Sequence, residues 1–82
     1  MSSDFKYTLR LMTNGAEVWK RWTGDRDEAA RITASALAAL GKADTLSGLV
    51  MMAAVKDPPA GADAITTHSA DLRSTLTLSI KQ

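Results

Sequence analysis

The chain has no cysteine, one histidine and only four aromatic residues in 82. Without cysteine it can form neither a disulfide framework nor a thiolate site, and a lone histidine is too few for the usual zinc sites. No apolar run approaches the ~18 residues of a membrane-spanning helix. The polar start, Met1 to Asp4, is unlike a secretory leader. We therefore expect a cytoplasmic protein with no cofactor, no bound metal and no membrane contact.

Neither basic nor acidic residues are present in excess. Ten basic and nine acidic residues leave a net charge of +1, so no global field draws the chain to nucleic acid or anionic lipid. Apolar residues make up 45% of the chain, which is typical of a folded protein. The length predicts one domain over residues 1–82 with a thin core, and a homodimer would add buried surface.

The first third of the chain predicts a β-hairpin. Residues 5–12 alternate between apolar and polar positions, which indicates a half-buried strand. Asn14 and Gly15 favour a two-residue type I′ turn, and residues 17–23 form the return strand. In this register the core side carries Tyr7 opposite Trp22, Leu9 opposite Lys20, and Leu11 opposite Val18. The opposite side carries Arg10 beside Trp19, Thr8 beside Arg21, and Met12 beside Glu17.

A helix is predicted over residues 26–40. Asp25 is a good N-cap, Glu28 completes a capping box, and Gly41 favours termination. Residues 49–56 are apolar at both odd and even positions, which we interpret as a third strand that is either central in the sheet or has one face against a partner. In that strand Met51 and Met52 are expected to fill the core, although methionines can also form an adaptable contact surface.

The last third of the chain is less regular. Residues 62–71 form either a long loop or a loop with a short strand over 65–68, and residues 73–81 form a final strand with alternate apolar positions directed inward. The order ββαββ predicts an α+β fold: a four-stranded, mainly antiparallel sheet with one helix packed on one face. The other face is left open, which invites a partner.

The predicted open face carries the candidate binding residues. They are Trp19, Arg10, Arg21, Lys6, Met12 and Glu17. Trp19 between two arginines is typical of a protein-interface anchor, because tryptophan and arginine are enriched there. The same residues could stack on bases and hold phosphates, or Trp19 and Arg10 could simply satisfy each other across the ladder.

Catalytic patterns are weak. His68 lies among threonines and serines, and we expect an exposed loop histidine. Ser69 and Asp71 are near it in sequence, but catalytic triads assemble in space rather than along the chain. The glycines form neither a P-loop nor a dinucleotide-binding motif. We therefore predict that the protein is not an enzyme.

Short strands flank an alanine-rich helix that begins with residues 27–31 (DEAAR) and ends at Leu40-Gly41. This architecture resembles that of small proteins encoded by phages and mobile elements, including some anti-CRISPR inhibitors. The resemblance implies a stoichiometric inhibitor of a larger protein complex. We predict a non-enzymatic protein-binding module that uses the open sheet face or an edge strand. The alternative is a small nucleic-acid-binding protein that uses the same face.

Overall fold

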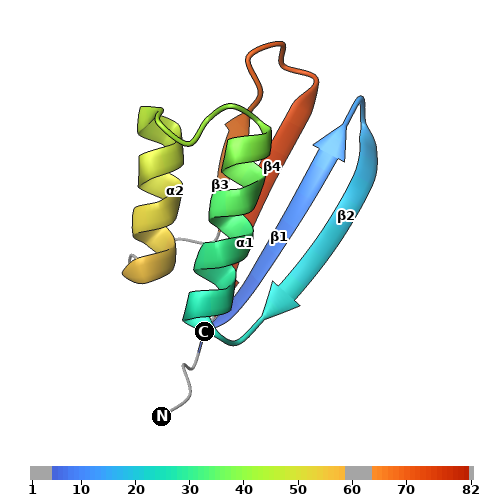
Figure 1. Ribbon diagram of the computed structural model, residues 1–82. Coiled ribbons are helices and arrows are strands. Elements are labelled where there is room, and N and C mark those ends of the chain that lie inside the picture. The colour runs from blue at the N-terminus through green and yellow to red at the C-terminus, as the bar shows by residue number, and fades with distance from the viewer. Residues whose placement is uncertain (1–4, 59–63, 82) are drawn as a thin grey trace.

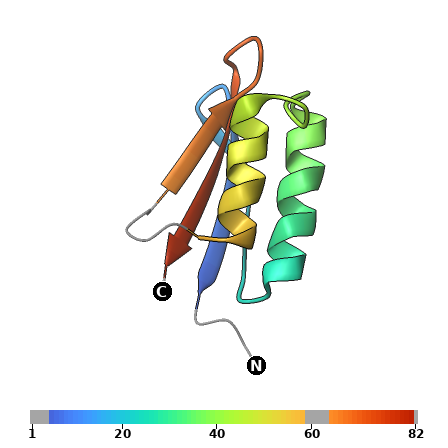
Figure 2. The same ribbon diagram turned by 90° about the vertical axis from the view of Figure 1, so that its left-hand side faces the viewer.

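A computed structural model describes residues 5–58 and 64–81. Its elements are β1 (Lys6–Thr13), β2 (Ala16–Thr23), α1 (Arg26–Ala39), α2 (Leu46–Lys56), β3 (Ala64–His68) and β4 (Ser74–Lys81). The strands form one antiparallel sheet in the order β2-β1-β4-β3. Both helices lie on the same face of the sheet, as the two views in Figures 1 and 2 show. The predicted α+β class and four-stranded antiparallel sheet are confirmed, with two helices in place of one.

The hairpin turn forms as its sequence predicts. Asn14 and Gly15 both have positive φ, 52° and 80°, which is the requirement of a type I′ turn. Thr13 pairs with Ala16 and Met12 with Glu17, as expected. Beyond that point the register shifts, because Leu11 pairs with Trp19 and Val18 is left as an extra residue in β2. This insertion is a β-bulge.

The bulge overturns the predicted faces of β2. Tyr7 pairs with Thr23 rather than Trp22, and Thr8 pairs with Trp22. Because side chains alternate along a strand, a shift of one residue sends each to the opposite face. Trp19 therefore lies on the helix side of the sheet and Trp22 on the open side. The predicted pairing of Arg10 with Trp19 is wrong, since Arg10 pairs with Lys20.

Local signals define α1. The Asp25 side chain accepts hydrogen bonds from the backbone N–H groups of Asp27 and Glu28, so the predicted N-cap is confirmed. At the other end Lys42 N–H donates to the Leu37 carbonyl, and Gly41 has φ of 71°. This is the Schellman arrangement that a glycine after the last turn favours. The helix ends at Ala39, one residue before the predicted end.

The prediction of a strand over residues 49–56 is wrong, because these residues belong to α2. An apolar run of this length has no period that separates a strand from a buried helix. The overlooked signal is Thr45, whose hydroxyl accepts a hydrogen bond from Gly48 N–H and caps the helix. Gly48, Met51 and Val55 are buried at helical spacing, so Met51 fills the core as expected.

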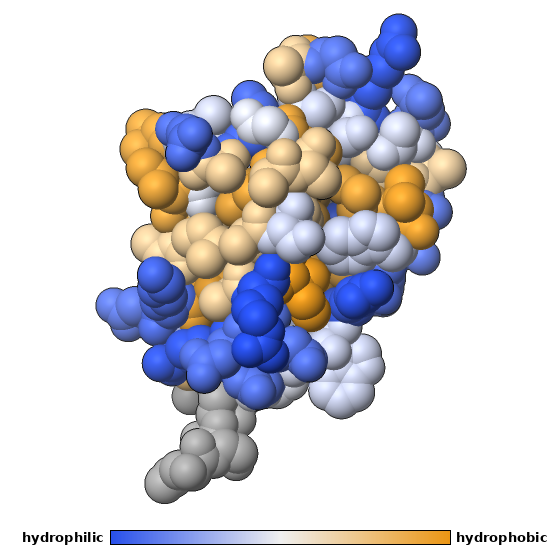
Figure 3. Space-filling model, viewed as in Figure 1, coloured by the Kyte–Doolittle hydropathy of each residue, from blue (hydrophilic) through white to orange (hydrophobic). Residues whose placement is uncertain are grey.

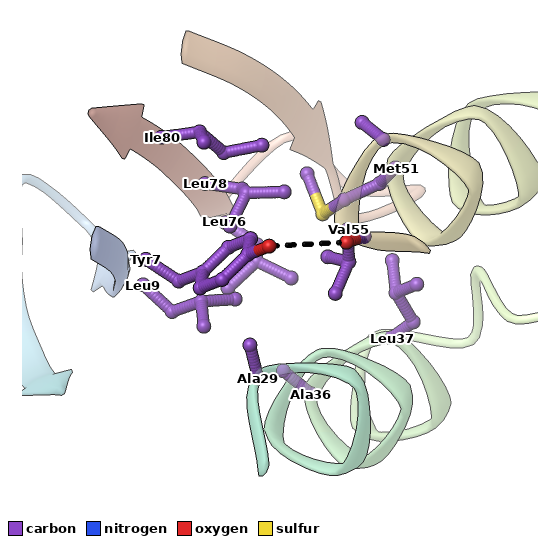
Figure 4. Close-up of a cluster of buried hydrophobic side chains, with 11 residues drawn as sticks. Tyr7, Leu9, Ala29, Ala36, Leu37, Met51, Val55, Leu76, Leu78 and Ile80 are labelled. Carbon is purple, nitrogen blue, oxygen red and sulfur yellow. Dashed lines mark hydrogen bonds between the residues drawn. The ribbon is translucent and has the colours of Figure 1, made fainter. Parts of the chain in front are cut away.

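The last third of the chain agrees with the short-strand alternative. β3 covers the predicted residues 65–68, and β4 directs Leu76, Leu78 and Ile80 into the core. Figure 4 shows these side chains meeting Tyr7 and both helices. The Tyr7 hydroxyl donates to the Val55 carbonyl at 3.4 Å, which ties β1 to the end of α2.

Gly48 marks the closest approach between α2 and the connection that precedes it. A Cβ added at Gly48 would collide with the Lys42 carbonyl oxygen, so Gly48→Ala must displace the backbone. We expect a loss of about 1–3 kcal/mol in the free energy of unfolding, despite the better helix propensity of alanine. Chemical denaturation measures it. Gly24→Ala is the control, because its new Cβ would meet only Phe5 O at 3.9 Å; a Gly48→Ala protein as stable as this control would contradict the expectation.

Candidate ligand-binding face of the sheet

The sheet face opposite the helices, called the open face below, is formed by alternate residues of the four strands. It contains a shallow hollow of ≈ 440 Å³ over the first half of β1 and the last residues of β2 and β4. The hollow is lined by Lys6, Thr8, Arg10, Lys20, Trp22, Thr77, Ser79 and Lys81. Four of these eight residues are cations and none is acidic. The lining is therefore suited to an anion.

Two pairs of these cations face each other directly across the ladder. Arg10 is opposite Lys20 in the β1–β2 pairing, and Lys6 is opposite Lys81 in the β1–β4 pairing. Like charges at directly opposite positions destabilise a sheet, by roughly 0.2–1 kcal/mol for each pair. An anionic ligand between them would relieve the repulsion.

Trp22 stands at the border of the hollow and is 66% exposed. The Lys6 ammonium lies 4.8 Å from the centre of its ring, a cation–π contact worth roughly 0.5–1 kcal/mol at an exposed site. A large aromatic side chain with this much free surface offers a flat platform for another planar group. Trp22 thus occupies the position on the open face that the sequence predicted for Trp19.

Hydroxyl groups complete the open face. Thr8, Thr77 and Ser79 line the hollow itself, and each can donate or accept a hydrogen bond. Towards β3, the His68 imidazole Nδ1 lies 3.2 Å from the Thr75 hydroxyl. The face therefore combines cations, hydroxyls and one exposed indole.

The six predicted binding residues do not all lie on one face of the sheet. Lys6 and Arg10 lie on the open face within the hollow. Met12 and Glu17 pair with each other beside the bulge, on the same face but outside the hollow. Trp19 and Arg21 lie on the helix side. The sequence analysis did not place Lys20, Trp22 and Lys81 among the binding residues of the open face. The correct hairpin register would have placed Lys20 and Trp22 there.

On the helix side, Trp19 and Arg21 border a groove of ≈ 330 Å³ between the sheet and α1. Trp19 is partly buried and packs against the core, and the Arg21 guanidinium carbon lies 5.9 Å from its ring centre. The α1 side of the groove is formed by Arg31, Ile32, Ser35, Ala36 and Ala39. Trp19 thus lies between the sheet and α1 and forms part of the wall of this groove.

The serine, histidine and aspartate near one another in sequence do not form a relay. The Ser69 hydroxyl donates directly to the Asp71 carboxylate, while His68 lies against Thr75. Ser69 and the backbone N–H of Arg73 both donate to Asp71, and these hydrogen bonds lower the pKa of its carboxyl group. These contacts shape the turn between β3 and β4.

Over the described ranges, 5–58 and 64–81, no group of three or more histidine, aspartate or glutamate side chains is placed to hold a metal ion. Neither helix of the described chain has the length and apolar character to cross a membrane.

No family model matches the sequence. No curated protein matches it, and no solved structure does.

Proposed function

We propose that this protein is a non-enzymatic binding module that holds single-stranded nucleic acid on the open face of its sheet. The observation that carries the proposal is the hollow with four cations, no acid and an exposed tryptophan. Proteins that bind single strands combine a cationic groove for the backbone with aromatic side chains on which bases stack. Both features are present here within one hollow.

Each group has a role in this proposal. Trp22 stacks on a base, and Lys20 and Lys81, on either side of β1, contact phosphates. Thr77 and Ser79 donate hydrogen bonds to phosphate or sugar oxygens, which position the strand without reading its sequence. Binding of this kind carries little sequence specificity and falls steeply with salt. The cytoplasm, where RNA is abundant, is the proposed place of action.

The overall charge of +1 argues against nucleic acid only if the charges are mixed over the surface. They are not mixed in the hollow, where none of the acidic residues that the structure describes lies. Most of the described carboxylates belong to helix caps and turns: Asp25, Asp27 and Glu28 at the start of α1, Asp44 and Asp57 flanking α2, and Asp71 before β4. The segregation leaves the hollow basic although the chain is nearly neutral.

Trp22→Ala tests the stacking role. We expect binding of a fluorescently labelled single-stranded oligonucleotide to weaken by about 1–2 kcal/mol, roughly 5- to 30-fold, in an anisotropy titration at low salt. Trp22→Phe is the matched control and should retain most of the affinity, because it keeps an aromatic face. Wild-type protein that does not bind single strands at low salt, or equal binding by all three proteins, would contradict the proposal.

An acidic protein surface is the second candidate ligand, as in the stoichiometric inhibitor suggested by the sequence. The exposed Trp22 and Arg10, which line the same hollow, favour it, because these residue types anchor protein interfaces. Nuclease treatment separates the two candidates in a pull-down from cell lysate. A protein that is still pulled down after nuclease treatment, but not by the Trp22→Ala variant, would support protein binding. Loss of the bound material on nuclease treatment would support nucleic-acid binding.

A further inference from the structure

The side of α2 that faces away from the sheet and from α1 is apolar and uncovered. Leu46, Leu49 and Val50 are 78%, 57% and 49% exposed. Figure 1 places α2 at the outer margin of the described structure, and Figure 3 shows apolar surface over its upper part. Lys56 is the only charged residue of the helix. A helix that is apolar on all sides is typical of a buried environment.

Leu46, Leu49, Val50 and Ala53 lie on one side of the helix, at spacings of three and four residues, and together form the outer face of α2. A groove of ≈ 300 Å³ runs beside it, between α2 and β3. The groove is lined by Val50, Ala53, Ala54, Asp57 and Ile65. The outer face of α2 therefore has two large residues, Leu46 and Leu49. The smaller residues Val50 and Ala53 lie next to the groove, which can receive a large side chain.

We propose that a second copy of the chain covers this surface, with α2 packed antiparallel against α2 of the second copy. With the two-fold axis near Val50, Leu46 lies opposite Ala53 of the second copy, and Leu49 lies opposite its Val50. Each large side chain then meets a smaller one, and Leu46 enters the groove beside Ala53. Interdigitation of large with small side chains is the usual way in which two helices pack.

The charges at the ends of α2 support the antiparallel direction. Asp44 precedes the first turn and Lys56 lies in the last turn. In an antiparallel pair, Lys56 of each copy approaches Asp44 of the other, and the helix dipoles also oppose each other favourably. In a parallel pair, Asp44 would instead meet Asp44 of the second copy, and Lys56 would meet its Lys56. A polyanion is a poor match for a face whose only cation is Lys56.

The contact is small, since it rests on one helix face, so the dimer is expected to be weak. Sedimentation equilibrium of the whole chain, up to about 1 mM, should show a shift from 8.7 kDa towards twice that mass. Leu49→Lys should raise the dimer dissociation constant at least about tenfold, because it places two ammonium groups near the axis. Leu72→Lys is the matched control, an equally large change at a leucine that is 75% exposed in the β3–β4 turn.

The antiparallel arrangement has its own test. Asp44→Lys alone should weaken the dimer, and Asp44→Lys combined with Lys56→Asp should restore it, since the exchange recreates both pairs. Circular dichroism verifies that each variant is folded. A wild type that stays at 8.7 kDa, or a dimer unaffected by Leu49→Lys, would overturn the proposal. Failure of the exchange to restore the dimer would overturn the antiparallel direction.

Discussion

Trp19→Ala is expected to lower the free energy of unfolding by about 2–3 kcal/mol, which corresponds to roughly 10–20 °C in the melting temperature of a domain this small. Trp19 packs against the core and borders the groove between the sheet and α1, which Leu11 and Ala36 also line. Its removal would widen this groove and uncover core surface. The expected loss is below the 3–5 kcal/mol typical of a fully buried tryptophan, because Trp19 is only partly buried.

Trp22→Ala is the internal comparison for this experiment. Trp22 is 66% exposed, and the Lys6 ammonium lies 4.8 Å from the centre of its ring. We expect a loss of about 1 kcal/mol or less. Thermal denaturation of both variants at one fixed protein concentration decides between the two hairpin registers. A larger loss at Trp22 than at Trp19 would contradict the bulge and restore the regular ladder that the sequence predicts.

The hairpin shows where prediction from the sequence stops. Asn14-Gly15 fixes the turn and the first two pairs, because the backbone requirement is local. The bulge at Val18 has no comparable signal: both registers place one tryptophan on each side, and the choice depends on how Trp19 packs against α1. Packing between elements distant in sequence therefore decides which tryptophan is exposed.

Local sequence patterns also fail to determine the structure of α2 and the residues that line the hollow. The apolar run of α2 fits a buried strand as well as a helix, and only Thr45 as a cap favours the helix. In the hollow, Lys81 meets Lys6 through pairing of the first strand with the last. A contact between chain ends cannot be deduced from local pattern. The sequence did indicate an open basic and aromatic face, and the structure changed the residues that compose it.

The like-charge pairs of the open face give the second large effect. The double variant Lys20→Glu with Lys81→Glu replaces one cation of each pair by a carboxylate opposite Arg10 or Lys6. If the hollow binds single-stranded nucleic acid, affinity at low salt should fall on the order of 100-fold. The slope of log affinity against log salt should also become shallower by about 1.4, since each lost phosphate contact contributes about 0.7 for single strands.

The same double variant should be more stable than the wild type, by roughly 0.2–1 kcal/mol for each pair, because attraction replaces repulsion across the ladder. A loss of binding with a gain of stability is expected where like charges are kept together for a ligand rather than for the fold. Arg26→Glu with Arg31→Glu is the control, because it makes the same change in net charge on α1, which lies on the other side of the sheet. Equal weakening by both double variants would show that net charge alone drives binding, whereas weakening confined to the open face would place the ligand in the hollow.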